Sequence, residues 1–491
     1  MGTGEIMTMN ILVLEHPRLP SKPHFNDIAN TPLWSCIMAG YVFSALEGAG
    51  FKPYILNANE QGLDFKQTVT EICAYQPDLL TVNTVYFWEH TGLFFKMIRD
   101  LRHYGFTGHI NLFGFFPTLH YRRLLQERGV DSIAVGECEQ TLVELAQSLP
   151  NCYPVKGLAT KEFPFVPRKQ VENLDTLAFP FRTKAQLKHS VSILASRGCY
   201  NHCSFCPIPS FYNDGPLWRG RSVADIIEEI TELMEQGADS FYFVDPNFIG
   251  PGRAGRGRTV DLLNQLRPLS LRFGMETRAT DLDDGLMEHL VQAGLTTLLL
   301  GVESGSNTGL QDFGKNETVD ESARGIALCR RAGIEPEIGF LMFTPNSTPL
   351  SLRENMKFLE QNDLLDRLDR TANLLCHQQI IMAGTTGFKQ YDKRGILKTN
   401  GPFDFIGKVE FQSAKVKRAA EAVTSLCHFI LRETGRKDSP IYFQTAGSYS
   451  KFSELNELLV AEIKHHFEQP ESADMQCSLQ KLQDHIKIYT K

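Results

Sequence analysis

Five short apolar runs, each followed by an amphipathic helical pattern, fill the first third of this chain of 491 residues. Short runs rich in Ile, Leu and Val suit strands that are buried on both faces, and helices between such strands are typical of parallel sheets. The pattern predicts a doubly wound, Rossmann-like α/β domain over residues 1–150, with ligands bound at the carboxyl ends of its strands. The runs are ILVLE from Ile11, KPYILN from Lys52, DLLTVN from Asp78, HINLFGF from His109 and DSIAVG from Asp131.

A second series of strand and helix patterns begins at Ser190, after a segment with no sustained periodicity. That segment, residues 151–189, contains Pro154, Pro164, Pro167 and Pro180, and we interpret it as a linker. The later apolar runs are SVSILAS from Ser190, SFYFVD from Ser240, TTLLLGVES from Thr296 and EIGFLMF from Glu337. Repeated βα units predict a full or partial (β/α) barrel over residues 190–404, whose chemistry takes place at the strand carboxyl ends. Residues 405–491 are predicted to form a helical C-terminal region.

The composition narrows the class of protein. A formal net charge of −7 argues against nucleic acid as a partner, because surfaces that bind it usually carry a basic patch. No apolar run of about eighteen residues could span a bilayer, and Glu5 and Glu15 interrupt the segment where a secretory signal needs an apolar core. We expect a cytoplasmic protein without a membrane span. Its eleven cysteines are then better explained as free thiols plus a metal site than as disulfides.

Three of these cysteines, Cys199, Cys203 and Cys206, form a CxxxCxxC pattern directly after the first predicted barrel strand. A loop this short can place three thiolates around one corner of a 4Fe–4S cluster and leave the fourth iron without a protein ligand. A zinc site is the alternative, but zinc needs a fourth ligand. His202 lies inside the loop, yet its position next to Cys203 makes joint ligation awkward. The spacing therefore favours an iron–sulfur cluster.

The cysteine triplet, the aromatic Phe205 before its last member and the βα repeat resemble the radical S-adenosylmethionine (SAM) superfamily. The resemblance implies that the open iron chelates SAM, and that one electron cleaves SAM to a 5′-deoxyadenosyl radical. It also implies that Phe205 helps to bind the cofactors, and that an electron donor such as flavodoxin or ferredoxin is a partner. In such enzymes the cofactor carries the difficult chemistry, and the barrel keeps the radical away from water.

Further segments resemble the SAM-binding parts of this family. VDPNF, which contains Asp245, lies at the end of the second barrel strand. GVESGS, which contains Glu303 and Ser304, lies at the end of the fourth, which includes the run from Thr296. The resemblance implies that backbone carbonyls of the first receive the SAM amino group and that the second binds the ribose, with Glu303 as the favoured residue. Arg278 is a candidate for the SAM carboxylate, because a guanidinium can bind it in two places. A salt bridge at the barrel rim is an equally open reading of Arg278. WRGRS, from Trp218, resembles the segment that follows the cluster loop.

The N-terminal domain resembles the cobalamin-binding domain of one large subfamily. The resemblance lies in VGECEQTLVEL, which contains Gly136 and Glu137, and in GFFPTL, which contains Phe115, Phe116 and Pro117. The glutamates of the first segment could also simply favour a helix dipole. The DxHxxG motif that donates a histidine to cobalt is absent from the chain. This absence predicts cobalt without a protein nitrogen on its lower face, and we expect the apolar residues 115–117 to cover that face.

The resemblance implies methylation of an unactivated carbon or phosphorus centre in a small metabolite or peptide. One SAM would methylate cobalamin, and a second would give the radical that activates the substrate. Cobalamin-assisted cyclisation, rearrangement or oxidation without methyl transfer is the alternative, because the acceptor pocket is not a motif. A methylthiotransferase is disfavoured, since the surroundings of Cys36, Cys73 and Cys138 do not resemble its second cluster motif. The intact triplet argues against a degenerate binding module.

Overall fold

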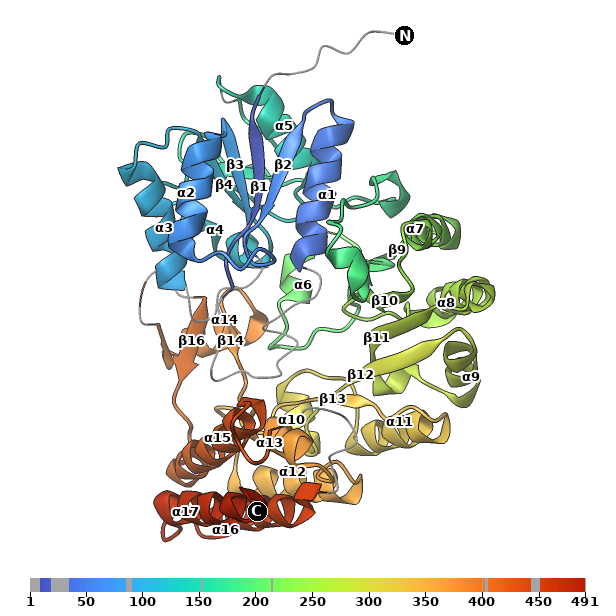
Figure 1. Ribbon diagram of the computed structural model, residues 1–491, viewed down its shortest axis with the longest axis vertical. Helices are drawn as coiled ribbons and strands as arrows, with labels where there is room; N and C mark the ends of the chain where they lie inside the picture. Colours follow the sequence, from blue (N-terminus) through green and yellow to red (C-terminus); the bar gives the residue numbers. More distant parts are fainter. Residues whose placement is uncertain are drawn as a thin grey trace.

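A computed structural model describes residues 9–18, 35–84, 91–151, 153–212, 215–399, 401, 405–442 and 451–490. A parallel sheet flanked by helices forms one end of the molecule, a second parallel sheet lies in the middle, and a layer of helices forms the other end (Figure 1). Among the described residues, no helix combines the length and the apolar character needed to cross a membrane.

The N-terminal sheet has six strands in the order β2-β1-β3-β4-β5-β6. The first five are parallel, as the apolar runs predict, and the doubly wound fold is confirmed. The sixth strand, β6, pairs antiparallel with β5 and comes from the segment interpreted as a linker. At three residues it is too short to show a strand period. The strands are β1 (Ile11–Glu15), β2 (Pro53–Asn57), β3 (Leu79–Asn83), β4 (His109–Phe113), β5 (Ser132–Ala134) and β6 (Leu158–Thr160).

Helices cover both faces of this sheet because its strands are apolar on both sides. One face packs against α1 (Ser35–Gly48) and α5 (Glu139–Ser148), and the other packs against α2 (Phe65–Tyr75) and α3 (Thr91–His103). The short helix α4 (Phe115–Leu124) begins directly after β4. The edge at which α4 begins is the carboxyl edge of the sheet, and it faces the second domain (Figure 1).

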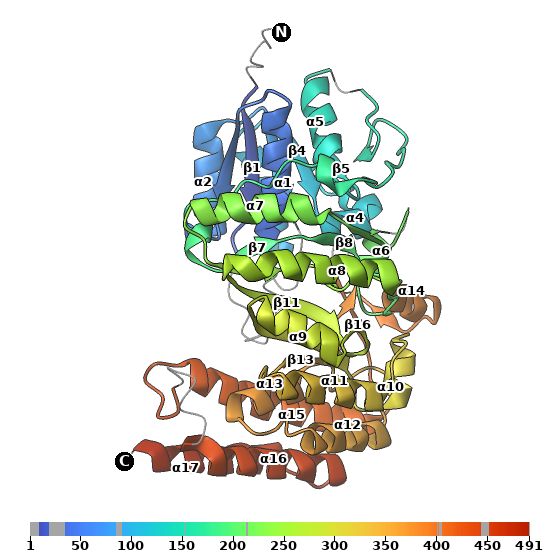
Figure 2. The ribbon, with the colours of Figure 1, turned by 90° about the vertical axis from the view of Figure 1, so that its right-hand side faces the viewer.

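The second sheet has five parallel strands in the order β13-β12-β11-β10-β7. The described residues contain no pairing of β7 with β13, so the barrel is partial rather than closed. Helices line its outer face in chain order (Figure 2). The strands are β7 (Val191–Ile193), β10 (Ser240–Phe243), β11 (Arg272–Arg278), β12 (Leu295–Glu303) and β13 (Glu337–Phe340). The helices are α7 (Val223–Glu235), α8 (Gly252–Leu266), α9 (Asp284–Gln292), α10 (Asn307–Asp312), α11 (Val319–Arg331) and α12 (Pro349–Gln361).

A small antiparallel hairpin interrupts the connection between β7 and α7. Its strands are β8 (Ser196–Gly198) and β9 (Trp218–Gly220), and the short helix α6 (Ile208–Phe211) lies between them. The three cysteines of the CxxxCxxC pattern follow β8 directly. The hairpin therefore carries the cysteine loop into the space between the two sheets (Figure 2).

The C-terminal region is helical, as predicted, except near its beginning. The helices α13 (Leu368–Cys376), α15 (Ala414–Gly435), α16 (Ser453–Glu468) and α17 (Met475–Ile486) pack together. A three-stranded sheet of β14 (Ile381–Met382), β16 (Ile406–Val409) and β15 (Leu397–Lys398), with α14 (Thr386–Lys393), precedes α15. Residues 382 and 405 of this part belong to the same apolar cluster as Phe116. The chain therefore returns to the N-terminal domain. The four ranges into which the sequence was divided above stay predictions.

Candidate active site

The thiols of Cys199, Cys203 and Cys206 lie together between the two sheets, and each is partly exposed. Burial raises the pKa of Cys203 to about 12, while nearby Lys315 lowers it. Burial also raises the pKa of Cys206 well above its usual value, and the charges of the other two thiols add to this effect. Three thiols that disfavour one another's ionisation need a strong cation to become thiolates, which bound iron provides.

The arrangement fits a cluster better than a single metal ion. In the described part of the chain, no three His, Cys, Asp or Glu side chains come together closely enough to hold one ion. In a 4Fe–4S cluster each thiolate binds a different iron, so the sulfurs lie farther apart than the ligands of a zinc ion. His202, the fourth ligand that a zinc site would need, is exposed. Cys199, Cys203 and Cys206 therefore remain the predicted cluster ligands and the predicted catalytic centre.

Backbone contacts hold the cysteine loop from two sides. The amide of Ser204 donates to the carbonyl of Phe313 at 2.7 Å, and the amide of Gly387 donates to the carbonyl of Ser204 at 2.7 Å. The ring of Phe205 meets the ring of Phe313 edge-on, with 5.2 Å between centroids. Phe205 thus packs the loop against the segment after β12. Its role in cofactor binding stays a prediction.

Asp245, predicted near the SAM amino group, has a carboxylate that is already engaged by the protein. It is fully buried and accepts hydrogen bonds from the amide of Ala195 at 3.0 Å and from the hydroxyl of Ser196. Burial raises its pKa to about 6, although both hydrogen bonds oppose this. Asp245 therefore fixes the start of the cysteine hairpin, while SAM binding by this segment stays a prediction.

Glu303 and Ser304 stand at the carboxyl end of β12. Glu303 has a φ of 67°, a left-handed conformation that is uncommon for a residue other than glycine and often marks a functional position. Its carboxylate lies 3.6 Å from Lys315 Nζ. Burial raises the pKa of Glu303, and Lys315 opposes the rise. The hydroxyl of Ser304 instead donates to Oδ1 of Asn355, on α12, at 2.9 Å, so Glu303 is the better candidate for a ligand.

Arg278 lies at the end of β11, near the cysteine loop. Its Nη2 donates to the carbonyl of Asn316 at 3.0 Å, and its guanidinium lies over the ring of Tyr200 at 5.9 Å. Glu317 is 3.9 Å away, and the buried Nε of Arg278 has no hydrogen-bond partner among the described residues. The guanidinium is thus only partly used. Its role as the ligand of the SAM carboxylate stays a prediction.

The three residues at the start of α4, Phe115, Phe116 and Pro117, are all buried, but they do not share one surface. Phe115 packs against Phe211 beside the cysteine loop, at 4.3 Å between ring centroids. Phe116 packs against Phe405 of the C-terminal part, at 4.8 Å. Only Phe115 belongs to the apolar cluster that includes Cys199 and Cys206. That the three together cover a cobalt face stays a prediction.

Gly136, after β5, lines a cavity of about 240 Å³ between the N-terminal domain and the segment after the cysteine loop. Its φ is 81°, and nothing lies within 4 Å of the place where a Cβ would stand. The cavity has a mixed lining. It includes Thr118, Tyr121, Phe165, Gln170, Ser210 and Lys389. The sheet edge is therefore open at Gly136. Glu137 also lines this cavity, but its side chain is buried.

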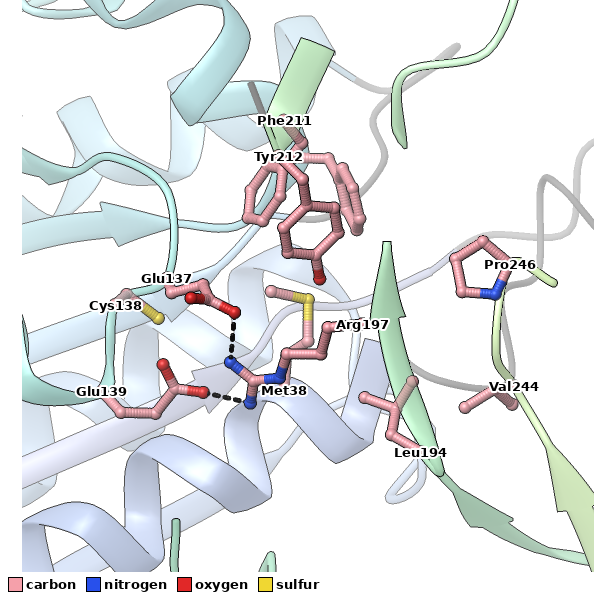
Figure 3. Close-up of a pocket in the computed structure, with 11 residues that line it drawn as sticks. Met38, Glu137, Cys138, Glu139, Leu194, Arg197, Phe211, Tyr212, Val244 and Pro246 are labelled. Carbon is pink, nitrogen blue, oxygen red and sulfur yellow. Dashed lines mark hydrogen bonds and ion pairs between the residues drawn. The ribbon is translucent and has the colours of Figure 1, made fainter. Parts of the chain in front are cut away.

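The carboxylate of Glu137 is buried against two arginines that sequence reasoning did not single out as functional, Arg197 and Arg219. Burial alone would raise the pKa of Glu137, but the arginines outweigh it and hold that pKa below its usual value. Beside them lies a cavity of about 20 Å³, room for about one water molecule (Figure 3). The domains are thus closely packed here. Arg197 lies in the segment ASRGC and Arg219 in the segment WRGRS, but neither segment indicates that its arginine pairs with Glu137.

The barrel interior also contains a carboxyl group that sequence reasoning missed. The hydroxyl of Tyr242 lies 3.5 Å from Oε1 of Glu276, on β11. The side chain of Glu276 is only partly buried. Burial raises the pKa of Glu276 to about 7, and the charges of Asp245 and Glu303 add to the rise. Because alternate residues of a strand point to the same face, Glu276 shares the face of Arg278. The choice of Arg278 as a site residue could therefore have led to Glu276.

Residues 193–359 match the family model of the Radical SAM superfamily. The chain contains a radical SAM domain. This domain implies a 4Fe–4S cluster and SAM as cofactors, and the match begins just before the cysteine hairpin.

Curated relatives of this radical SAM protein include a methyltransferase and a cyclase. It is 26% identical over 252 residues to the uncharacterized methyltransferase PH0819 of Pyrococcus horikoshii, a match that covers 48% of this chain and 54% of that protein. It is 25% identical over 359 residues to the anaerobic magnesium-protoporphyrin IX monomethyl ester cyclase of Cereibacter sphaeroides, covering 66% of this chain and 56% of that protein. The chain spans little more than half the length of these relatives.

The fold as a whole is similar to a solved structure of the cobalamin-dependent S-adenosylmethionine radical enzyme OxsB with aqua-cobalamin bound. The TM-score is 0.73 at 17% identity, and the match covers 98% of this chain and 76% of that one. The likeness therefore includes the N-terminal sheet, the radical SAM domain and the C-terminal helices. The chain has the fold of a cobalamin-dependent radical SAM enzyme.

Proposed function

We propose that this protein is a cobalamin-dependent radical SAM enzyme that methylates an unactivated carbon or phosphorus centre of a small metabolite or peptide. The observation that carries the proposal is the position of the cysteine loop against the carboxyl edge of the N-terminal sheet. Cys199 and Cys206 pack against the apolar cluster that contains Phe115. Phe115 is the first residue of α4, and only Gly114 separates it from the end of β4. Ligands of doubly wound domains bind at this edge, so a cofactor held there faces the thiols.

The residues at this edge leave room for a cofactor that carries both polar and apolar groups. Gly136 leaves the end of β5 open to the cavity described above, whereas the ring of Phe115 is buried against Phe211. The DxHxxG motif is absent from the sequence, so we propose a corrinoid whose lower face receives no protein nitrogen. When bound, the cluster with SAM supplies a carbon-centred radical, and the corrinoid supplies a carrier for a methyl group.

The protein's own residues have three tasks in this proposal. The three thiols hold irons and leave one coordination position open. Glu303 and Arg278, at the ends of adjacent strands, bind and orient SAM through charge-assisted hydrogen bonds. The barrel interior, with Tyr242 and Glu276, holds the acceptor and keeps water away from the radical.

The test is anaerobic incubation of the reconstituted protein with SAM labelled in its methyl group, cobalamin, a reductant such as reduced flavodoxin, and extract of the host. We expect 5′-deoxyadenosine, S-adenosylhomocysteine and a product whose mass carries the label. The matched control replaces Cys199, Cys203 and Cys206 with serine, which removes iron and nucleoside production together. Serine variants that keep both would contradict the proposal at its first step.

A second candidate is radical cyclisation without methyl transfer. The match to the Cereibacter cyclase covers 66% of this chain, more than the 48% of the match to the Pyrococcus methyltransferase. The two candidates differ in what becomes of SAM. Methylation gives 5′-deoxyadenosine and S-adenosylhomocysteine in about equal amounts, because each turnover uses one SAM for each. Cyclisation gives 5′-deoxyadenosine without matching S-adenosylhomocysteine.

A further inference from the structure

The hairpin that carries the cysteine loop contains an electrostatic conflict. Arg197 of β8 and Arg219 of β9 are direct cross-strand partners. Like charges in this position destabilise an antiparallel pair. Both guanidiniums are also buried, with only 7% and 6% of their side chains exposed, so water cannot screen them. The hairpin therefore needs an anion between its two arginines.

The N-terminal domain supplies that anion as Glu137. Its Oε1 accepts a hydrogen bond from Arg197 Nη1 at 3.0 Å and one from Arg219 Nη2 at 2.9 Å. Its Oε2 accepts from Arg219 Nη1 at 3.0 Å and from the amide of Val171 at 2.7 Å. Both carboxylate oxygens are thus bound by protein donors, and one carboxylate joins both strands of the hairpin.

A second carboxylate balances the charge. Glu139 Oε1 accepts from Arg197 Nη2 at 2.5 Å (Figure 3). The buried group then contains two arginines and two glutamates, and it is neutral. Aromatic rings cover it, with Tyr41 at 4.9 Å from the Arg197 guanidinium and Tyr212 at 5.5 Å from that of Arg219. Loss of any one charge leaves an uncompensated buried charge, which costs far more than loss of a surface ion pair.

This neutral group lies next to the cluster ligands, since only Gly198 separates Arg197 from Cys199. We infer that Glu137 is a positioning residue that docks the N-terminal domain on the hairpin and thereby holds the cysteine loop in its cluster-binding geometry. The cluster site is complete only when the two domains are docked. The inference rests on the proposed function in one respect, that the loop binds a cluster. It gives Glu137 a role other than contact with a cofactor.

The test measures how fast a chelator removes iron from the reconstituted protein, in variants of stated charge. Glu137→Gln and Arg219→Gln each unbalance the buried group, whereas the double variant restores neutrality with the pair of Arg197 and Glu139 intact. The control is Glu144→Gln, on helix α5, which begins two residues after Glu137; its carboxylate is partly exposed and pairs with Arg168. Far-UV circular dichroism and thermal unfolding of the iron-free proteins are measured alongside.

We expect Glu137→Gln to lose iron at least fivefold faster than the wild type, and Glu144→Gln to match the wild type. The double variant should lose iron more slowly than either single variant, and its unfolding midpoint should be higher than theirs. A residue that merely fills space would not produce this rescue. If Glu137→Gln does not fold, Arg219→Gln compared with the double variant makes the same test.

Two outcomes would overturn the inference: equal iron loss from the Glu137 and Glu144 variants, or a double variant that is worse than both single ones. Failure of the proposed function looks different, because the wild-type protein would then bind no cluster. The unfolding midpoints of the iron-free proteins still test the buried charge group in that case.

Discussion

The ring of Phe115 packs on the ring of Phe211, with 4.3 Å between centroids and 40° between planes. The first residue begins the helix after β4 of the N-terminal sheet, and the second ends the short helix after the cysteine loop. Both rings are buried, with 1% and 6% of their surface exposed. The contact therefore joins the two domains beside the cluster ligands, on the same side as the pair of Glu137 and Arg197.

Phe211→Ala is expected to destabilise the protein by about 3–5 kcal/mol, because it removes a buried ring and leaves a cavity between the domains. The measurement is urea unfolding of the iron-free protein, followed by circular dichroism. Tyr104→Ala is the control, since that ring is 66% exposed, and its cost should stay below about 1 kcal/mol. Equal costs for the two variants would show that the domain contact contributes nothing.

Gly198→Ala is expected to damage the cysteine loop far more than a comparable glycine replacement elsewhere. Gly198 has a φ of 90°, and a Cβ there would lie 1.9 Å from the carbonyl oxygen of Leu217. Gly237 has a φ of 98°, but nothing lies within 4 Å of its Cβ position. Gly237→Ala should therefore cost about 1–2 kcal/mol for the left-handed backbone alone.

Gly198→Ala must in addition break the pairing of β8 with β9, and we expect a total cost of about 3 kcal/mol or more. The readouts are the urea midpoint and the iron content after reconstitution. The glycine at 237 serves as the matched control for both. Full iron content in the Gly198 variant would mean that the hairpin does not shape the cysteine loop.

Most strands of the two parallel sheets could be predicted from the sequence because each is a compact apolar run bounded by turn residues. The strand β11 was not among the predicted runs, because charged and polar residues interrupt its apolar ones. The run from Ile11 gives β1, and the run from Lys52 gives β2 to within one residue. The strands β6, β14 and β15 were missed because two or three residues show no period. The hairpin of β8 and β9 was missed for the same reason.

The site was predictable only where spacing along the chain decides the chemistry. The cysteine triplet meets that condition, because its three members lie within one loop. Arg197 and Glu137 are 60 residues apart, and Arg219 and Glu137 are 82 apart, so no local pattern joins them. Asp245 shows a second limit. Its motif locates it at a strand end but does not indicate what its side chain binds. The carboxylate accepts hydrogen bonds from Ala195 and Ser196.

The stability of the iron-free protein is expected to fall as pH rises from about 5 to 8, in part because of Glu276. Burial raises the pKa of this carboxyl from 4.5 to about 7 in the folded state. A group with a raised folded pKa binds its proton more tightly when folded. Its contribution is therefore complete below the unfolded pKa and is lost as pH rises through the folded pKa.

Glu276→Gln removes this contribution, so the slope of stability against pH should become shallower, by about 2 kcal/mol across the range. Thermal midpoints at pH 5, 6, 7 and 8 measure it. Some slope should persist, because burial also raises the pKa of Asp245, to about 6. An unchanged slope in the variant would mean that Glu276 is freely hydrated inside the barrel.

Glu303→Gln is expected to weaken SAM binding without weakening the fold. Burial raises the pKa of Glu303, and Glu317 raises it further against the opposing charge of Lys315. The ionised carboxylate of Glu303 therefore lowers the free energy of unfolding, and replacement by the neutral amide of glutamine removes this destabilisation. The unfolding midpoint of the variant should equal or exceed that of the wild type at pH 8.

A hydrogen bond to a charged group contributes about 1.5–3 kcal/mol, so loss of the charge should weaken SAM binding about tenfold to a hundredfold. Equilibrium dialysis of SAM against the reconstituted protein measures this. The control is Glu337→Gln, an exposed glutamate at the amino end of β13, opposite to the end where barrel ligands bind. If both variants bind SAM like the wild type, the left-handed backbone of Glu303 serves the bulge between β12 and β13 and not the cofactor.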